Sequence, residues 1–259
     1  MKNRFSLKNR TIVITGPTGY LGLEMAKGLN DFGAKLILIS RSKDKLISLN
    51  KQLGPQHIVV AGDISSSDFS SNLPSELSRL GVTKIDGIIN NAYSGETGTI
   101  SVSSEIDFIN SFNLNLKGPF SLIKALLPFL SKSEHDIKTI VNIASMYGKR
   151  SPNHHIYDDE KSCNPIQYGA TKAGLIQMTK YLGAYLAEQN IRVNSISPGP
   201  FPNQSNCDKD FLNRLKERVP LQRLGSPEDL VGTVIFLSSQ SCSYITGADF
   251  PVDGGWTVW

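Results

Sequence analysis

Near the start of the chain stands the segment Thr11-Ile12-Val13-Ile14-Thr15-Gly16-Pro17-Thr18-Gly19-Tyr20-Leu21-Gly22, in which a β-branched run leads into three spaced glycines. Beyond it, Leu21, Met25 and Leu29 share one face of a helix. Such glycines allow a tight turn and a close approach of the backbone to a pyrophosphate, while the helix N-terminus offers amide donors. The segment therefore predicts a strand, a phosphate-binding turn and a helix. An ordinary glycine turn is the alternative.

The rest of the chain repeats this alternation of short β-branched runs with longer segments of helical period. Such alternation is typical of a parallel sheet that helices cover on both faces. Strands are predicted at Thr11–Thr15, Lys35–Ser40, His57–Gly62, Ile85–Asn90, Ile137–Ala144, Ile191–Ser197 and Asp249–Val252, and helices at about 20–32, 43–53, 67–80, 104–131, 167–189, 208–217 and 227–239. We therefore expect an α/β fold with a Rossmann-type doubly wound parallel sheet of about seven strands, in a single domain over residues 1–259.

The composition excludes several broad classes of protein. The 259 residues carry 27 basic and 23 acidic side chains, a formal net charge of +4. No block of like charges is present, so we expect no nucleic-acid partner and no anionic membrane surface as partner. No apolar run approaches the roughly 20 residues that span a bilayer, and the N-terminus lacks the pattern of a signal peptide. Because Cys163, Cys207 and Cys242 are widely spaced, we expect reduced thiols in a cytoplasmic protein.

The end of the second predicted strand reads Leu38-Ile39-Ser40-Arg41-Ser42. Dinucleotide sites that prefer NAD usually place a carboxylate here, where it accepts a hydrogen bond from the ribose 2′-hydroxyl. Arg41 offers a guanidinium instead, which suits a 2′-phosphate through a charge-assisted contact. We therefore predict that NADP(H) is preferred and that NAD(H) is also possible. The alternative is that Arg41 only opens the next helix with Lys43 and Lys45.

Four polar residues form the predicted catalytic set. Tyr168 and Lys172 lie four residues apart in a predicted helix, so a phenol and an ammonium share one face. A neighbouring cation lowers the pKa of a phenol, which suits proton transfer in an alcohol–carbonyl couple. Ser145 ends the fifth predicted strand, where its hydroxyl can project into the cleft, and Asn115 lies on the preceding long helix. Taken singly, Tyr168 and Lys172 could be surface packing and Asn115 a surface amide.

At this point the chain resembles the short-chain dehydrogenase/reductase family, over essentially its whole length. Further ordered matches are Asp63 after the third predicted strand, Asn90-Asn91-Ala92 after the fourth, Pro198-Gly199 after the sixth, and the tail segments Tyr244–Gly247 and Val252–Gly255. The chain length, the Asn90–Ala92 motif and the tail resemble the compact branch of that family. Proteins of this family associate into dimers or tetramers, so the resemblance implies self-association, which we expect through the helices at about 104–131 and 167–189.

The resemblance also implies roles for individual residues. Tyr168 would be the general acid/base, Lys172 would lower its pKa and hold the nicotinamide ribose, and Ser145 would polarise the carbonyl. Asn115 would support a water-linked proton relay. Asp63 would contact adenine, and Asn90 would line the cofactor channel. The residues expected to bind the cofactor are Gly16, Thr18, Gly19, Tyr20, Leu21, Gly22, Ser40, Arg41, Asp63, Ile64, Asn90, Asn91, Ala92, Tyr168, Lys172, Pro198 and Gly199.

Three features depart from the compact branch. The glycine pattern is G-x-x-G-x-x-G, and Ser145 and Tyr168 are 23 residues apart; both features resemble the longer branch that contains nucleotide-sugar epimerases and dehydratases. Tyr93 follows Ala92 where the family usually has glycine. Because of this bulky phenol, the shape of the cofactor channel does not follow from the family pattern.

Two long irregular segments leave the carboxyl ends of strands, and such segments are usually functional or disordered. One is an insertion at about 146–165, and the other is a substrate loop at about 198–217. The insertion holds Arg150, His154, His155, Tyr157, Asp158, Asp159, Glu160 and Lys161. Its histidines lack the spacing of a zinc site, so no metal is expected. We expect the insertion to line the substrate pocket and to select a polyhydroxylated substrate; a solvated excursion is the alternative.

The insertion and the ending Trp256-Thr257-Val258-Trp259 are similar to oxidoreductases of bacterial surface-sugar and flagellin modification. The favoured function is an NAD(P)-dependent oxidoreductase acting on a carbonyl or secondary alcohol of a small, sugar-like or nucleotide-sugar molecule. Two alternatives stay open. One is a non-catalytic dinucleotide-binding regulatory protein, because a fold does not determine function. The other is a sugar epimerase or dehydratase that uses bound cofactor without net turnover.

Overall fold

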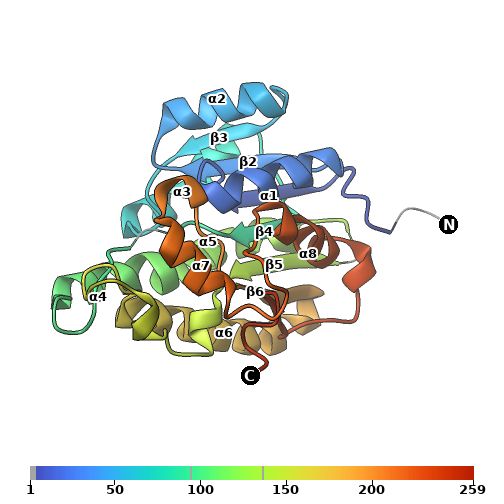
Figure 1. Cartoon of the computed structure of the whole chain (residues 1–259). Helices are drawn as coiled ribbons and strands as arrows, with labels where there is room; N and C mark the ends of the chain where they lie inside the picture. Colours follow the sequence, from blue (N-terminus) through green and yellow to red (C-terminus); the bar gives the residue numbers. More distant parts are fainter. Residues whose placement is uncertain (1–3, 94, 136) are drawn as a thin grey trace.

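The structure, a computed structural model, describes residues 4–93, 95–135 and 137–259. Within these residues, seven strands form one parallel sheet in the order β3-β2-β1-β4-β5-β6-β7 (Figure 1). The strands are β1 (Thr11–Thr15), β2 (Lys35–Ser40), β3 (Ile58–Ala61), β4 (Gly87–Asn90), β5 (Lys138–Ile143), β6 (Ile191–Pro198) and β7 (Asp249–Val252). The strand order reverses between β1 and β4, and this reversal opens a crevice at their carboxyl ends. The predicted fold class is confirmed.

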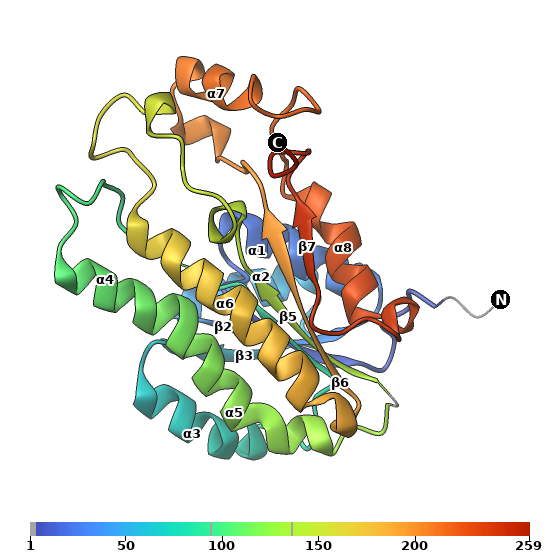
Figure 2. The same cartoon turned by 90° about the horizontal axis from the view of Figure 1, so that it is seen from below.

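Helices cover both faces of the sheet (Figure 1). One face is covered by α1 (Tyr20–Asp31), α2 (Lys43–Leu53) and α8 (Glu228–Ser238), and the other by α3 (Ser67–Arg79), α5 (Gly118–Ser131) and α6 (Ile166–Tyr185). Two shorter helices, α4 (Glu105–Phe112) and α7 (Lys209–Lys216), lie toward the periphery (Figure 2). Within the described residues, no helix is both long and apolar enough to cross a membrane.

The core is divided by the sheet into two apolar layers. In β1, Ile12 and Ile14 belong to the layer under α1 and α8, while Val13 between them belongs to the layer under α3 and α5. In β2, Leu38 belongs to the layer under α1 and α8, and Ile37 belongs to the layer under α3 and α5. Because successive side chains of a strand point to opposite faces, a sheet buried on both faces needs unbroken apolar strands. This requirement explains the continuous β-branched runs in the sequence.

Strands β3, β4 and β5 begin later than predicted, and in β3 and β4 side chains take over hydrogen bonds of the ladder. His57 was expected in β3, but its Nδ1 accepts a hydrogen bond from the Leu36 N–H at 3.0 Å. Likewise, the Asp86 carboxylate accepts from the Thr11 N–H at 2.7 Å, and β4 begins only at Gly87. A backbone donor at a strand end needs a partner, and a ring nitrogen or carboxylate supplies it here.

The predicted continuous helix over 104–131 is wrong in one respect. A π-helical turn, η1 (Asn113–Lys117), separates α4 from α5. The Gly118 N–H donates to the Asn113 carbonyl, five residues back, and Pro119 has no N–H with which to restore the α-helical ladder. Such turns are frequent at functional sites, and this one contains Asn115. The helix predicted over 167–189 is also shorter, because α6 ends at Tyr185 and a 3-10 turn, η4 (Ala187–Gln189), follows it.

The two irregular segments contain short helical pieces. The insertion has two 3-10 turns, η2 (Met146–Gly148) and η3 (His154–Ile156), while the substrate loop has η5 (Gln204–Asn206) followed by α7. A last 3-10 turn, η6 (Gln240–Cys242), follows α8. Both irregular segments leave the same end of the sheet, after β5 and β6, which are neighbours in it.

The layered core predicts how much one side chain contributes to stability. Ile37 is fully buried in β2, so Ile37→Ala should lower the free energy of unfolding by about 2–5 kcal/mol in urea titration. Ile47, which is 51% exposed on α2, provides the matched control, and Ile47→Ala should change it by no more than about 0.5 kcal/mol. Equal losses for the two variants would contradict the proposed core.

Candidate active site

A cavity of about 570 Å³ opens at the carboxyl ends of the strands, where the strand order reverses. It brings together residues from the turns after β1, β2, β3, β4, β5 and β6 and from α6. Of the residues predicted from the sequence, those lining it are Gly16, Thr18, Gly19, Tyr20, Leu21, Gly22, Ser40, Arg41, Asp63, Ile64, Asn91, Ala92, Ser145, Tyr168, Lys172, Pro198 and Gly199. Asn90 and Asn115 do not line it.

The turn after β1 is closed by contacts that only glycine permits. Gly16 has φ +64°, in the left-handed region. A Cβ on Gly22 would lie 2.1 Å from the Gly16 carbonyl oxygen. The side-chain amide of Asn91 donates to the carbonyls of Thr15 and Gly16, at 3.0 and 3.1 Å. The turn is therefore tied to the loop after β4, and the first turn of α1 faces the cavity.

The donors around this turn fit a dinucleotide. No side chain caps α1, whose N-cap residue is Gly19, so the amides of its first turn are left for a ligand. An anion at that helix end also meets a favourable dipole. The cavity wall beyond β2 carries Arg41 and Lys45, and within the described residues neither forms an ion pair with a carboxylate. Pyrophosphate and a second phosphate both match this arrangement.

Ser145, Tyr168 and Lys172 meet at the inner end of the cavity. The Lys172 ammonium donates to the Ile143 carbonyl at 2.6 Å and lies 5.7 Å from the centre of the Tyr168 ring. The Ser145 hydroxyl accepts from the Tyr147 N–H at 3.1 Å, and it also hydrogen-bonds the Tyr168 phenol. These contacts bring together a hydroxyl from the turn after β5 with a phenol and an ammonium from α6.

The pKa of Tyr168 is raised and not lowered in this arrangement. Burial raises the pKa of the Tyr168 phenol, and the hydrogen bond with Ser145 lowers it only in part. Burial also lowers the pKa of Lys172 to about 8. The ammonium is directed at the Ile143 carbonyl and lies beside the phenol ring, so desolvation outweighs its attraction for a phenolate. The two groups therefore favour their neutral forms more than the free side chains do.

Asn115 lies one layer behind the cavity. It is buried in η1, where its amide donates to Ser111 at 3.0 Å and to Thr171 at 3.3 Å. Its side-chain carbonyl has no partner among the described residues. Since Thr171 precedes Lys172 on α6, Asn115 joins η1 to the helix that bears the phenol and the ammonium. It is not a surface amide.

Asn90 does not line the cofactor channel, contrary to the expectation. Its side-chain amide donates to Asn142 at 2.8 Å, and Asn142 donates to Thr179 at 2.9 Å. These three residues join β4, β5 and α6 below the cavity floor. Strand alternation explains the difference, because Asn91, the next residue, points to the turn after β1.

Sequence reasoning missed several residues of the cavity wall. They are Ile39, Ser42, Lys45, Gly62, Leu114, Ile143, Ala144 and Phe201. Lys45 was expected only to open a helix. Its position one turn beyond Arg41 is the pattern that could have placed it in the cavity wall. Tyr93 also lines the cavity, with its ring centre 5.0 Å from that of Tyr168 in an edge-on arrangement. The phenol in place of glycine therefore narrows the cleft beside Tyr168.

The insertion turns its apolar residues inward and its charged residues outward. Ile156 is buried, and the Tyr157 hydroxyl lies 3.1 Å from that of Tyr147. His154 and His155 are exposed, as are Asp158, Asp159, Glu160 and Lys161. Most of the charged side chains of the insertion therefore face solvent.

Comparison with known proteins gives matches over nearly the whole chain. A family model described as "Enoyl-(Acyl carrier protein) reductase" matches residues 20–257. The 3-oxoacyl-(acyl-carrier-protein) reductase FabG of Rickettsia felis is 32% identical over 256 residues, 96% of this chain and 97% of that relative. A short chain dehydrogenase of Leptospira borgpetersenii solved with bound NAD+ has a TM-score of 0.89 at 29% identity, over 99% of this chain and 96% of its own. A gluconate 5-dehydrogenase of Burkholderia cenocepacia, solved with NADP and tartrate, has a TM-score of 0.88 at 26% identity, over 99% of this chain and 98% of its own.

These matches agree with the sequence motifs and with the fold. The family model covers far more than half of the chain, and the relative from Rickettsia felis is similar along almost its entire length. The strand order and the position of the cavity are those of a doubly wound dinucleotide-binding sheet. The chain therefore belongs to the short-chain dehydrogenase/reductase family of oxidoreductases.

Proposed function

We propose that this protein transfers a hydride between a nicotinamide dinucleotide and a carbonyl or secondary alcohol. The observation that carries the proposal is a single cavity lined both by the glycine turn after β1 and by Ser145, Tyr168 and Lys172. A site that holds the cofactor and an acid–base group together orders the reactants before the chemical step. The names of the relatives, which are reductases and dehydrogenases, support the same reaction class.

Each catalytic residue has a role that its position allows. Tyr168 gives its proton to the substrate oxygen in reduction and takes one back in oxidation. Ser145 holds that same oxygen by a hydrogen bond and polarises the carbonyl. Lys172 supports the phenolate that forms in reduction and lies where it could bind ribose hydroxyls. Asn115 holds η1 against α6 and so orients the helix that bears Tyr168. When bound, the nicotinamide ring supplies or accepts the hydride.

The cofactor-binding residues divide along the cavity. The amides of Tyr20 and the rest of the first turn of α1 would hold the pyrophosphate, with Gly19 beside it in the cavity wall. Asp63 and Ile64 lie where adenine would bind. The remaining wall is formed by Thr18, Gly22, Asn91, Ala92, Pro198 and Gly199.

The cofactor preference is proposed from charge. Ser40, Arg41 and Lys45 line the outer end of the cavity, and no carboxylate follows β2 directly. A 2′-phosphate there would gain charge-assisted hydrogen bonds that a 2′-hydroxyl cannot make. NADP(H) is therefore the preferred cofactor, with NAD(H) as the weaker one.

For the substrate, we favour a small polyhydroxylated carbonyl compound, sugar-like or nucleotide-linked. Support comes from the structural similarity to a gluconate 5-dehydrogenase crystallised with tartrate and from the hydroxyls of Tyr147 and Tyr157, which lie 3.1 Å apart in the insertion. The inward apolar residues of the insertion, Ile156 above all, favour a second candidate, a ketone on an acyl chain. The name of the relative from Rickettsia felis agrees with that second candidate.

A substrate panel tests the function. We expect NADPH absorbance to fall when keto sugars, nucleotide keto sugars or 3-oxoacyl thioesters are added, with the keto sugars turned over faster. Tyr168→Phe should abolish turnover while NADPH binding and the melting temperature stay near those of the wild type, because only the transferable proton is lost.

The same assay separates the alternatives. A non-catalytic protein would bind NADPH without consuming it, and an epimerase or dehydratase would convert a sugar with no net absorbance change. Near-normal turnover by Tyr168→Phe would show that another group is the acid/base. Faster turnover of acyl thioesters would favour the second substrate class.

Cofactor preference should follow the charge at Arg41. Titration of both cofactors, monitored by protein fluorescence or calorimetry, should give tighter binding of NADPH than of NADH. Arg41→Asp should reverse or erase that preference, since a carboxylate accepts from a 2′-hydroxyl and repels a 2′-phosphate. Equal wild-type affinities for the two cofactors would contradict the proposal that the charge of Arg41 favours NADP(H).

Self-association is proposed through the helices on one face of the molecule (Figure 2). Large apolar side chains stand exposed there on three helices: Ile106, Ile109 and Phe112 on α4, Phe120 on α5, and Tyr181 and Tyr185 on α6. Single exposed apolar residues are common, but such a gathering usually marks an interface. Light scattering at micromolar concentration should show a dimer or tetramer, and Ile109→Glu with Tyr181→Glu should shift it toward monomer. A monomeric wild type would contradict the proposal.

A cytoplasmic location also remains part of the proposal. The three cysteines, Cys163, Cys207 and Cys242, are all free thiols in the structure, and reduced thiols are usual in that compartment. Cys163 and Cys242 are buried, which removes them from ready oxidation.

A further inference from the structure

Helix α7 lies apart from the sheet, beside the insertion (Figure 2). Among the other helices and strands of the described chain, η3 is the element against which it packs most extensively. The rings of Phe211 on α7 and Tyr157 on the insertion lie 5.5 Å apart, and Leu215 is buried near Ile156 in one apolar cluster. The insertion therefore supports this helix.

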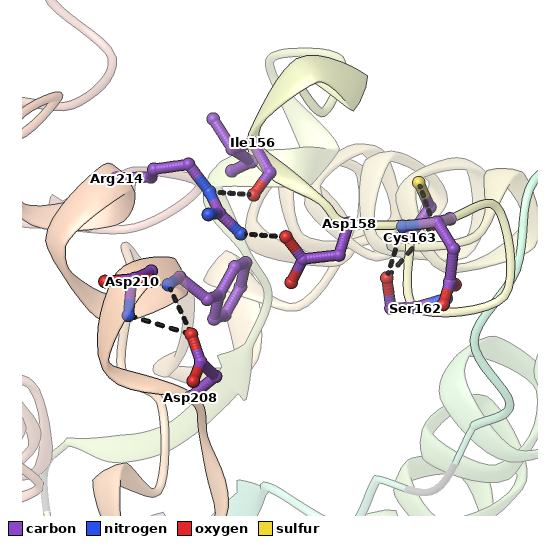
Figure 3. Close-up of polar contacts among 9 residues, drawn as sticks. Ile156, Asp158, Ser162, Cys163, Asp208, Asp210 and Arg214 are labelled. Atoms are coloured by element: carbon purple, nitrogen blue, oxygen red, sulfur yellow. Dashed lines mark hydrogen bonds and ion pairs between the residues drawn. The ribbon is translucent and has the colours of Figure 1, made fainter.

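One arginine joins the two segments by two directed hydrogen bonds (Figure 3). Arg214 Nε donates to the Ile156 carbonyl at 2.8 Å, and Nη2 donates to the Asp158 carboxylate at 2.6 Å. The guanidinium side chain is 33% exposed, whereas that of Asp158 is 65% exposed. A planar guanidinium can contact a carbonyl and a carboxylate in a fixed orientation, which an ammonium cannot reproduce. We call Arg214, Asp158 and the Ile156 carbonyl the latch.

Both sides of the latch are ordered by their own contacts (Figure 3). Asp208 caps α7 by accepting from the N–H groups of Asp210 and Phe211, at 2.8 and 3.3 Å. On the insertion, the Ser162 N–H donates to the Asp159 carboxylate at 2.8 Å, and the Cys163 thiol donates to the Asp159 carbonyl. The latch therefore connects two segments that already hold their local shape.

The insertion is also fixed at its far end. The Thr99 N–H donates to the Glu160 carbonyl at 2.9 Å, and the Gly98 N–H donates to the Cys163 carbonyl at 2.8 Å. With contacts to the loop after β4 and to α7, the insertion connects these two segments. Loss of the latch would leave the insertion joined to α7 by apolar contacts alone.

A continuous series of contacts leads from the latch to the proposed reaction centre. Tyr157, next to Ile156, contacts Phe211 by its ring and Tyr147 by its hydroxyl. Tyr147 then donates its N–H to the Ser145 hydroxyl at 3.1 Å. We call Tyr147, Tyr157 and Phe211 the aromatic wall. Tyr168 packs against the same apolar cluster, so this wall stands beside the phenol.

We propose that Arg214 is a positioning residue that determines substrate affinity. By holding η3 on α7, it keeps the aromatic wall closed beside Tyr168, on the side of the cleft away from the glycine turn. Arg214 does not line the cofactor cavity, so its effect falls on the substrate and not on the dinucleotide. The inference rests on the proposed oxidoreductase function for its kinetic consequence, but the closed arrangement of the two segments can be measured without turnover.

The kinetic test is Arg214→Ala, assayed with saturating NADPH and the best substrate of the panel. We expect KM to rise roughly five- to tenfold with kcat within about twofold, because positioning contacts for the substrate are lost while the acid/base stays in place. The NADPH dissociation constant and the melting temperature should stay near wild type, since an exposed ion pair contributes little to global stability.

Further variants distinguish the effect of losing the latch contacts from the effect of losing a positive charge on α7. Lys216→Ala removes one positive charge from the same helix at a side chain without a partner in the described chain, and it should leave KM unchanged. Asp158→Ala should raise KM less than Arg214→Ala, and the double variant should be no worse than Arg214→Ala alone. Arg214→Lys should recover only part of the affinity, because it keeps the charge and loses the second hydrogen bond.

Amide exchange read by mass spectrometry tests the latch independently of activity. With NADPH bound, peptides covering 153–164 and 204–217 should exchange faster in Arg214→Ala than in wild type or Lys216→Ala, while peptides of the glycine turn stay unchanged. If no panel substrate is turned over, the proposed function fails and this exchange result alone decides whether the latch holds the two segments together. Unchanged exchange, or an unchanged KM in an active enzyme, would overturn the proposal. A rise in KM equal to that of Lys216→Ala would overturn it too.

Discussion

The cleft depends on how closely the backbone packs where β1 ends. The position that a Gly22 Cβ would take lies 2.1 Å from the Gly16 carbonyl oxygen and 2.7 Å from the Asn91 side-chain nitrogen. Asn91 uses that nitrogen to hold the carbonyls of Thr15 and Gly16. Because β1 and β4 are the strands at which the sheet order reverses, joining their turns fixes the floor of the crevice. The uncapped amides of α1 then face it.

Burial controls the electrostatics at the inner end of this cleft. Tyr168 and Lys172 are both desolvated, and this raises the pKa of the phenol and lowers the pKa of the ammonium to about 8. The attraction between a phenolate and an ammonium is stronger in such surroundings than in water, because low dielectric strengthens it, although burial still raises the pKa of the phenol. On the proposed assignment, the site keeps the proton on Tyr168 until a substrate oxygen is present to take it. Lys172 is then positioned for the charge that develops.

The insertion shows how far composition can mislead about a pocket. Its many charged residues suggested a polar surface for a sugar, yet Asp159, Glu160 and Lys161 are exposed. The residues that it turns inward are Ile156 and Tyr157. A segment anchored at both ends buries its apolar side chains against the core and leaves its charges in water. Arg214 is the part of this arrangement that lies outside the insertion, fifty-six residues beyond Asp158 along the chain.

The class of fold and most residues of the cleft could be predicted from the amino-acid sequence alone. The apolar runs of the strands, the glycines at 16, 19 and 22, and the spacing of Tyr168 and Lys172 are local patterns, and local patterns predict strands, turns and helix faces. Contacts between residues distant in the chain could be found only in the folded molecule. His57 and Asp86 shorten two strands by accepting bonds from other strands, Asn90 turns to Asn142 beneath the cavity, and Arg214 reaches Asp158. These outcomes could not be read from spacing, because burial and hydrogen-bond satisfaction depend on which segments the fold brings together.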